Sequence, residues 1–133
     1  MRVADVSSHS LIKVDKSLSL RGAAIELNRN EVGVLAIENS HGVTGIFSER
    51  DLARAVADDA DVDRVQVAEY MTESPVIVDF DAPVGEAIGL MHRFGLRHLV
   101  VSRNGELNEL VSARDVLRMF APDLAQISQN LKA

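Results

Sequence analysis

The sequence predicts an α/β (α+β) protein built from two copies of one β-α-β-β-α unit, and three observations support this prediction. First, the 133-residue chain matches itself when it is shifted so that Val3 falls on Val67. Second, each copy contains an apolar pattern with helical spacing between short runs rich in β-branched residues. Third, the last two of these runs are joined by a short connection containing Asn and Gly, which is typical of an antiparallel hairpin.

The internal repeat aligns polar residues as well as apolar ones, and it needs no gap. The segment Ser48-x-Arg50-Asp51 falls on Ser112-x-Arg114-Asp115. Because charged and hydroxyl residues match together with the core pattern, we interpret the chain as a tandem duplication. Further matched pairs are Ala4/Ala68, Ser10/Ser74, Asp15/Asp79, Ala23/Ala87, Arg29/Arg93, Leu35/Leu99 and Arg54/Arg118.

In the first copy the elements follow in a regular order. Residues 12–14 form a short β-rich run that ends at an Asp, and residues 20–29 carry Ala and Leu at helical spacing. Residues 34–37 and 43–47 are apolar runs of strand length on either side of a turn. The last helix of the copy is expected to begin at Ser48, where a hydroxyl residue precedes a charged segment.

The second copy predicts the same elements at matching positions. A strand is expected at residues 76–78 and a helix at 84–94. The hairpin strands are expected at 99–101 and 107–111, and the final helix begins at Ser112. The order of elements is therefore β-α-β-β-α, twice.

The expected organisation is a first repeat at 1–57, an acidic linker at 58–66, a second repeat at 67–121 and a C-terminal tail or helix at 122–133. One repeat alone buries too little apolar surface to be comfortably stable. We therefore expect the two sheets to pack face to face about a pseudo-twofold axis, with two equivalent clefts between the repeats. The sequence DDADVD in the linker is expected to be solvated.

The last residues of the chain carry a small apolar stripe, because Leu124, Ile127 and Leu131 recur at spacings of three and four. We expect a terminal helix that packs on the module or on a second subunit. The alternative interpretation is a frayed tail.

The composition restricts the classes of function. A formal charge of −6 disfavours broad nucleic-acid binding, and the single Tyr and absent Trp provide no aromatic platform for bases. The absence of cysteine excludes disulfides, thiolate metal sites and a cysteine nucleophile. Neither a signal peptide nor an apolar run long enough to cross a bilayer is visible, so we expect a cytoplasmic protein.

The repeated Ser-x-x-Asp has two physical interpretations. At the start of a helix it is a capping box, in which the Ser and Asp side chains satisfy free backbone N–H groups. A helix N-terminus also attracts anions, so the same residues are compatible with a phosphate site. Arg50 and Arg114 lie in the first turn, where a cation is electrostatically unfavourable, and this favours a negatively charged partner. A carboxylate, with its two oxygens, is also geometrically suited to bind two vicinal hydroxyls.

With these motifs in place, the sequence resembles a tandem pair of cystathionine β-synthase (CBS) domains, also called a Bateman module. The resemblance rests on Gly45-Ile46-Phe47-Ser48-Glu49-Arg50-Asp51 and on the preceding strand Val32-Gly33-Val34-Leu35-Ala36-Ile37. It also rests on Tyr70-Met71-Thr72 ahead of Pro75-Val76, and on Gly95-Leu96-Arg97-His98-Leu99-Val100-Val101. The similarity covers the chain outside the linker and the C-terminal tail.

The resemblance implies a module that binds an adenosine-containing ligand, usually AMP, ADP or ATP, with S-adenosylmethionine as a known variant. It assigns the ribose hydroxyls to Asp51 and Asp115, and phosphate to Ser48 and Ser112 with nearby basic residues. The base is expected against apolar residues at the start of the first strand of each copy. The full set of expected nucleotide-binding residues is Ile12, Ser48, Arg50, Asp51, Pro75, Val76, His98, Ser112, Arg114 and Asp115.

Two positions depart from the family pattern. Glu109 stands where the motif has a glycine, and its carboxylate is expected to crowd or repel an anionic ligand at the second copy. Ser7-Ser8 stands where the second copy has Met71-Thr72, so the base-side loop of the first copy is atypical.

Other chemistry has little support in the sequence. The four histidines, His9, His41, His92 and His98, do not show the spacing of metal ligands. For His98 two interpretations stay open, an edge-strand residue beside the surface Arg97 or a group that helps neutralise a phosphate. The chain lacks a Gly-x-Ser-x-Gly elbow, a dinucleotide fingerprint and a Walker loop, and we therefore expect no enzyme activity.

The leading functional hypothesis is a stand-alone regulatory module that binds an adenine nucleotide in the cleft between its repeats. Such binding shifts the packing of repeats or subunits and changes the affinity for a protein partner in trans. By resemblance a homodimer is expected, with no obligatory cofactor, no nucleic acid and no membrane. The alternative is a structural dimerisation module with no bound nucleotide.

Overall fold

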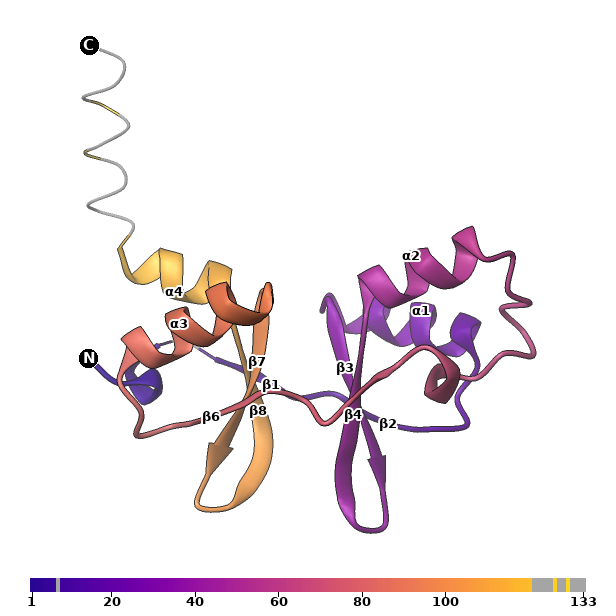
Figure 1. Ribbon diagram of the computed structural model, residues 1–133, viewed down its shortest axis with the longest axis horizontal. Helices are drawn as coiled ribbons and strands as arrows, with labels where there is room; N and C mark the ends of the chain where they lie inside the picture. The colour runs from indigo at the N-terminus through magenta and orange to yellow at the C-terminus, as the bar shows by residue number, and fades with distance from the viewer. Residues whose placement is uncertain (7, 121–125, 127–128, 130–133) are drawn as a thin grey trace. The chain divides into compact units, whose positions relative to one another are not determined.

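The computed structural model describes residues 1–6, 8–120, 126 and 129, and over these residues the chain forms two compact units (Figure 1). Unit 2 consists of residues 11–75. Unit 1 combines residues 1–10 with the chain from residue 76 onward.

Unit 2 contains a four-stranded sheet with two helices, in the strand order β2-β3-β4-β5. Strand β2 pairs with β3 in parallel, whereas β3–β4 and β4–β5 are antiparallel. The elements are β2 (Lys13–Asp15), α1 (Leu20–Asn30), β3 (Val34–Asn39), β4 (Gly42–Ser48), α2 (Glu49–Ala57), the 3₁₀ turn η2 (Val67–Glu69) and β5 (Thr72–Glu73).

Unit 1 repeats this arrangement, with the strand order β1-β8-β7-β6. Strand β6 pairs with β7 in parallel, and β7–β8 and β1–β8 are antiparallel. The elements are the 3₁₀ turn η1 (Val3–Asp5), β1 (His9–Ser10), β6 (Ile77–Asp79), α3 (Val84–Phe94), β7 (His98–Arg103), β8 (Glu106–Ser112) and α4 (Ala113–Met119).

The predicted mixed α/β order and both hairpins are confirmed. A parallel first strand is possible because a whole helix separates it from its partner, which gives the chain enough length to return. The short strands β1 and β5 were not predicted, because two residues carry no periodic pattern. The face-to-face packing of the two sheets stays a prediction.

Each unit has its own apolar core beneath the helices. In unit 2, Leu20, Leu35 and Phe47 are fully buried, and they come from α1, β3 and β4 respectively. Burial of side chains of this size contributes roughly 1.5–3 kcal/mol each. The core of unit 1 is built from Val, Leu, Met and Ala, with Leu99 and Val111 almost completely buried.

Each core also contains one valine from the other sequence repeat. Val3 belongs to the core of unit 1, and its counterpart Val67 belongs to the core of unit 2. The N–H groups of Val3 and Ala4 donate to the carbonyls of Ala82 and Phe80, at 2.8 and 2.9 Å. The repeats in the sequence and the compact units in space therefore differ by an exchange of their first segments.

The same exchange holds the segment around Val67 in unit 2. The N–H of Val67 donates to the carbonyl of Leu18 at 2.8 Å, and the N–H of Leu20 donates to Val65 at 3.0 Å. The bond from Leu20 satisfies an N–H in the first turn of α1, where the helix itself offers no partner. Helix α1 is also capped by Ser19, whose side chain accepts from the N–H of Gly22 at 3.0 Å.

The acidic segment at 58–66 is solvated on one side only. Its aspartates are exposed, as expected, and Asp63 forms an ion pair with Arg21 of α1. Val62 and Val65, however, pack against the core of unit 2. The alternation of Asp and Val therefore attaches this segment to α1.

The expected C-terminal helix or tail at 122–133 lies outside the described residues, except for Gln126 and Gln129. Among the described helices, none combines the length and the apolar character that crossing a membrane requires.

We predict that Val3→Ala and Val67→Ala each lower the free energy of unfolding by roughly 0.5–3 kcal/mol, because each removes buried methyl groups from a core. The location of the damage tests the exchange. Native-state hydrogen exchange should become faster in β6, β7 and β8 for Val3→Ala, and in β3 and β4 for Val67→Ala. Faster exchange of β3 and β4 in Val3→Ala would contradict the exchanged arrangement.

Candidate functional site

Helix α2 begins directly after β4, and its first turn is built around Ser48 and Asp51. The side chain of Ser48 accepts a hydrogen bond from the N–H of Asp51 at 3.3 Å. In return, Asp51 Oδ2 accepts from the backbone N–H and the hydroxyl of Ser48, at 2.8 and 3.1 Å. This is a complete capping box, and it holds the Asp51 carboxylate in a fixed, buried position with 6% exposure.

Helix α4 has the same start in unit 1. The side chain of Ser112 accepts from the N–H of Asp115 at 3.0 Å. Asp115 Oδ2 accepts from the N–H and the hydroxyl of Ser112, at 2.9 and 2.8 Å. Asp115 is only 2% exposed. The predicted helix starts and the capping interpretation are thus confirmed in both copies.

The cap uses only one oxygen of each carboxylate, and the other oxygen, Oδ1, has different surroundings in the two units. In unit 1 it forms a hydrogen bond of 2.9 Å with Nε2 of His9. In unit 2 the guanidinium of Arg54 lies 3.3 Å from Asp51 Oδ1 and forms an ion pair. The same guanidinium donates its hydrogen bond to the carbonyl of Tyr70 at 3.0 Å. Among the described residues, no donor makes a hydrogen bond to Asp51 Oδ1.

The pKa of Asp115 reflects two opposing effects. Burial raises the pKa, because the charged carboxylate loses contact with water. Hydrogen bonds from Ser112 and His9 to the carboxylate lower it and outweigh burial, so the pKa of Asp115 lies below its ordinary value. Asp115 is therefore an anion at neutral pH.

The register of the strands shows which expected residues gather near each helix start. In unit 2, Ser48 pairs with Val34 at the start of β3, and the carbonyl of Ile12, just before β2, accepts from the N–H of Ala36. Ile12 and the start of α2 therefore lie at the same end of the sheet. Pro75 closes unit 2 in the sequence and is half-buried.

Unit 1 brings together the corresponding residues. His98, the first residue of β7, pairs with Ser112 at the start of α4, and the Val76 carbonyl accepts from Val100. Strand β7 lies between β8 and β6, so the interpretation of His98 as an edge-strand residue is wrong. Arg50 and Arg114 lie in the first turns of α2 and α4, and both side chains are exposed.

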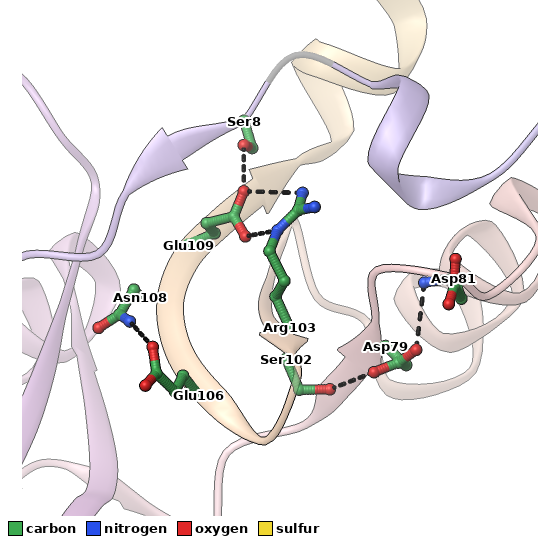
Figure 2. A network of polar contacts seen from close by, with 8 residues as sticks. All are labelled: Ser8, Asp79, Asp81, Ser102, Arg103, Glu106, Asn108 and Glu109. Atoms are coloured by element: carbon green, nitrogen blue, oxygen red, sulfur yellow. Dashed lines mark hydrogen bonds and ion pairs between the residues drawn. The ribbon is translucent and has the colours of Figure 1, made fainter.

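Glu109 does not stand as an unpaired charge beside the helix start. Figure 2 shows its carboxylate between the guanidinium of Arg103, at 2.8 Å, and the hydroxyl of Ser8, at 3.1 Å. The hydrogen bond from Arg103 lowers the pKa of Glu109, which keeps it ionised and paired. Arg103 also lies over the Phe80 ring, 4.5 Å from its centroid. Glu109 is therefore ion-paired with Arg103, and its expected effect on an anionic ligand stays a prediction.

The glycine at the equivalent position, Gly45, has a packing role. A Cβ at Gly45 would lie 2.8 Å from Sδ of Met71 and 2.9 Å from the carbonyl oxygen of Thr72. Strand β5 thus approaches β4 too closely for a side chain at this position. In unit 1 the approaching residue is Ser10, and Glu109 has room to turn towards Arg103.

Sequence reasoning missed His9 as a site residue. In the ungapped repeat, Ser8 is the counterpart of Thr72. In the structure, Thr72 lies opposite Ile46, and the residue opposite the equivalent Leu110 is His9 and not Ser8. The N-terminal strand is therefore displaced by one residue relative to the repeat. Nothing in the local pattern of the first ten residues indicates this displacement.

Over the described residues, no group of three or more His, Cys, Asp or Glu side chains is placed to hold a metal ion. An apolar groove of about 290 Å³ lies between α3 and α4 in unit 1. It is lined by Ile88, Met91, Ala113, Val116, Leu117 and Phe120.

Comparison with known proteins identifies the same two segments. A family model described as "CBS domain" matches residues 3–58 and 67–122. An uncharacterized 17.7 kDa protein of Acidianus ambivalens is 33% identical over 119 residues, which are 88% of this chain and 71% of that protein. The arabinose 5-phosphate isomerase KdsD of Yersinia pestis is 27% identical over 121 residues, 89% of this chain but only 37% of the isomerase.

Among solved structures, a CBS domain protein from Pyrobaculum aerophilum complexed with AMP superimposes with a TM-score of 0.81. Its sequence is 30% identical, and the match covers 95% of this chain and 99% of that chain.

We predict that Asp115→Asn lowers the free energy of unfolding at neutral pH by roughly 1–3 kcal/mol, because a charged acceptor of buried hydrogen bonds is lost. Since the pKa of Asp115 is depressed below the ordinary 3.8, the stabilisation is complete above that value and disappears as the pH falls through the folded-state pKa. Urea unfolding at pH 7 and pH 2.5 measures this difference. Glu106→Gln, at an exposed position of the same unit, is the control, and an equal effect of Asp115→Asn at both pH values would contradict the prediction.

Proposed function

We propose that this chain, which belongs to the CBS domain family, is a regulatory module that binds an adenosine-containing nucleotide through the carboxylate at the start of α2. The observation that carries the proposal is the buried Asp51, whose Oδ2 is fixed by the capping box while Oδ1 receives no hydrogen bond from the described residues. AMP, ADP and ATP are the proposed ligands, with S-adenosylmethionine as the variant.

The chemistry of the helix start suits a nucleoside phosphate. A fixed carboxylate with an oxygen that accepts no hydrogen bond within the protein can accept hydrogen bonds from the adjacent hydroxyls of a ribose, each contributing roughly 1.5–3 kcal/mol. The first turn of α2 presents backbone N–H groups and a partial positive charge, which favour a phosphate. Arg50 is exposed in that turn and adds a full positive charge. Ser48 is proposed as a further phosphate contact, and Ile12 and Pro75 as apolar contacts of the base.

Unit 1 offers the equivalent residues Ser112, Arg114, Asp115, Val76 and His98. The similar protein from Pyrobaculum aerophilum is complexed with AMP, which supports an adenine nucleotide as the ligand. No reaction is proposed: the ligand acts as a signal that changes the affinity for a protein partner by linkage.

We further propose a homodimer formed by the groove between α3 and α4. Leu117 and Phe120 are 56% and 38% exposed, although both are large and apolar. The same surface thus carries both an apolar groove and apolar side chains that project beside it, as a self-complementary twofold interface requires. The counterparts of Ile88 and Leu117 in unit 2 are Ala24 and Ala53, so the apolar surface is reduced there. The resemblance to CBS pairs also favours a dimer.

A structural module without nucleotide is the second candidate function. Two features of unit 1 favour this candidate. His9 binds Asp115 within the protein, and the apolar groove suits contact with another protein surface, so neither feature needs a nucleotide.

We predict that Asp51→Ala weakens AMP binding ten- to a hundredfold in titration calorimetry, because one or two hydrogen bonds from the ribose are lost. Asp51→Asn retains an acceptor for the cap and serves as a second variant with less effect on folding. Circular dichroism verifies that both variants are folded. A change of ligand gives a second test. The wild type should bind 2′-deoxy-AMP more weakly than AMP, whereas Asp51→Ala should bind 2′-deoxy-AMP and AMP with equal affinity. Unchanged affinity of both variants for AMP would refute the ribose assignment.

We predict that Leu117→Glu converts the dimer to a monomer in multi-angle light scattering, because a carboxylate would be buried in the interface without a partner. Ile77→Thr replaces another exposed apolar residue of unit 1, outside the groove, and should leave the dimer intact. If the wild type is itself a monomer at micromolar concentration, the proposed interface is wrong.

A further inference from the structure

The two helix starts are nearly identical except for the residue that faces the second carboxylate oxygen. His9 Nε2 lies 2.9 Å from Asp115 Oδ1 and makes a hydrogen bond, whereas Asp51 Oδ1 faces the guanidinium of Arg54 at 3.3 Å, which forms an ion pair but, among the described residues, no hydrogen bond. His9 itself is half exposed, and the carboxylate that it contacts is almost completely buried, with 51% and 1% of the two side chains exposed. The imidazole therefore bridges solvent and the buried carboxylate of Asp115.

The position of His9 has a structural counterpart in unit 2. His9 lies opposite Leu110 in the β1–β8 pair, and Thr72 lies opposite Ile46 in the β4–β5 pair. Leu110 and Ile46 are themselves equivalent, since they lie opposite Val100 and Ala36 in matching hairpins. The two units thus present a histidine and a threonine at one register position. A threonine is too short to repeat the His9 contact, and no hydrogen bond between Thr72 and Asp51 is found among the described residues.

The strand that carries His9 is held firmly in place. Ser8, the preceding residue, donates its hydroxyl to Glu109, and Glu109 is in turn fixed by Arg103 (Figure 2). On the N-terminal side, Arg2 forms an ion pair with Asp81 at 3.0 Å, and Val6 is buried in the core of unit 1. His9 is consequently prepositioned, and a ligand that displaced it would have to break an existing charge-assisted hydrogen bond.

The acceptor capacity of the carboxylate decides the consequence. Each carboxylate oxygen can accept about two hydrogen bonds. Oδ2 of Asp115 already accepts two, from the N–H and the hydroxyl of Ser112. With His9 on Oδ1, about one acceptor position is left on that oxygen. A vicinal diol needs two acceptor positions on its side of the carboxylate. At Asp51 Oδ1 no hydrogen bond from the described residues uses them, and the half-exposed Arg54 contacts this oxygen only as an ion pair.

We propose that His9 is a specificity-determining residue: by occupying Oδ1 of Asp115 it excludes ribose hydroxyls from unit 1 and restricts nucleotide binding to Asp51 of unit 2. The inference rests on the proposed nucleotide binding and deepens it, because it states which of two nearly equal helix starts takes the ligand. The choice is made by a residue from the N-terminal strand and not by the repeated motif.

The test exchanges the two residues that differ. His9→Thr is made in an Asp51→Asn background, so that AMP binding reports on Asp115 alone. We expect the background to bind AMP weakly and His9→Thr to tighten binding about tenfold, the equivalent of one hydrogen bond to a charged group. Adding Asp115→Asn should remove the gain, and 2′,3′-dideoxy-AMP, which lacks the hydroxyls, should show no gain. His9→Ala is the second variant, and circular dichroism confirms the fold of each.

The reciprocal variant, Thr72→His in the otherwise unchanged chain, places an imidazole at the equivalent position of unit 2. We expect it to weaken AMP binding about tenfold, while Thr72→Ser leaves binding within about twofold. An AMP affinity that changes less than about twofold in both the His9→Thr and the Thr72→His experiments overturns the inference. If that happens while Asp51→Asn still weakens binding, the role of Asp51 survives. If neither the wild type nor any variant binds AMP, ADP or ATP, the proposed function fails together with the inference.

Discussion

The exchange of the first segments between the two sequence repeats is the constraint on which both units depend. Residues 1–10 complete the sheet and the core of unit 1, and the segment around Val67 completes those of unit 2. Each helix start therefore lies beside a strand that comes from a different repeat of the sequence. The carboxylate and the cap are inherited from the duplication, but the residue that faces them is supplied by the exchanged strand. This arrangement allows two copies of one motif to acquire different binding properties without a change in the motif.

The capping box and a ligand site are compatible at one carboxylate because they use different oxygens. In both units Oδ2 accepts the two hydrogen bonds from the serine, and Oδ1 takes no part in the cap. The structural role keeps the Asp side chain buried and immobile. Little side-chain entropy of the protein would therefore be lost when a ligand binds to it. The structural and the ligand-binding interpretations of Ser-x-x-Asp therefore do not compete. What distinguishes the units is the neighbour of Oδ1, Arg54 in one and His9 in the other.

Much of the fold could be predicted from the sequence, because the duplication doubles every weak signal. The hairpins, the helices and the caps at Ser48 and Ser112 agree with the structure within a few residues. The exchanged strands could not be predicted, since two residues have no periodicity and the partners of β1 lie about a hundred residues away in the sequence. For the same reason His9 was missed, and the pairing of Glu109 with Arg103 was not foreseen. In each case the deciding contact lies outside the local sequence pattern.

The exchange also orders the events of biosynthesis. Unit 2 is a continuous stretch, residues 11–75, and all of its strands have been translated once Glu73 leaves the ribosome. Unit 1 is discontinuous. Val3 and Ala4 depend on the carbonyls of Ala82 and Phe80, and β1 cannot pair until β8 is synthesised about a hundred residues later. While residues 11–75 fold, the segment that carries Val3 and Val6 therefore still lacks the core of unit 1 in which it packs. Closure of the ladder between β1 and β8 would be the last step, and the His9 contact with Asp115 would form only then.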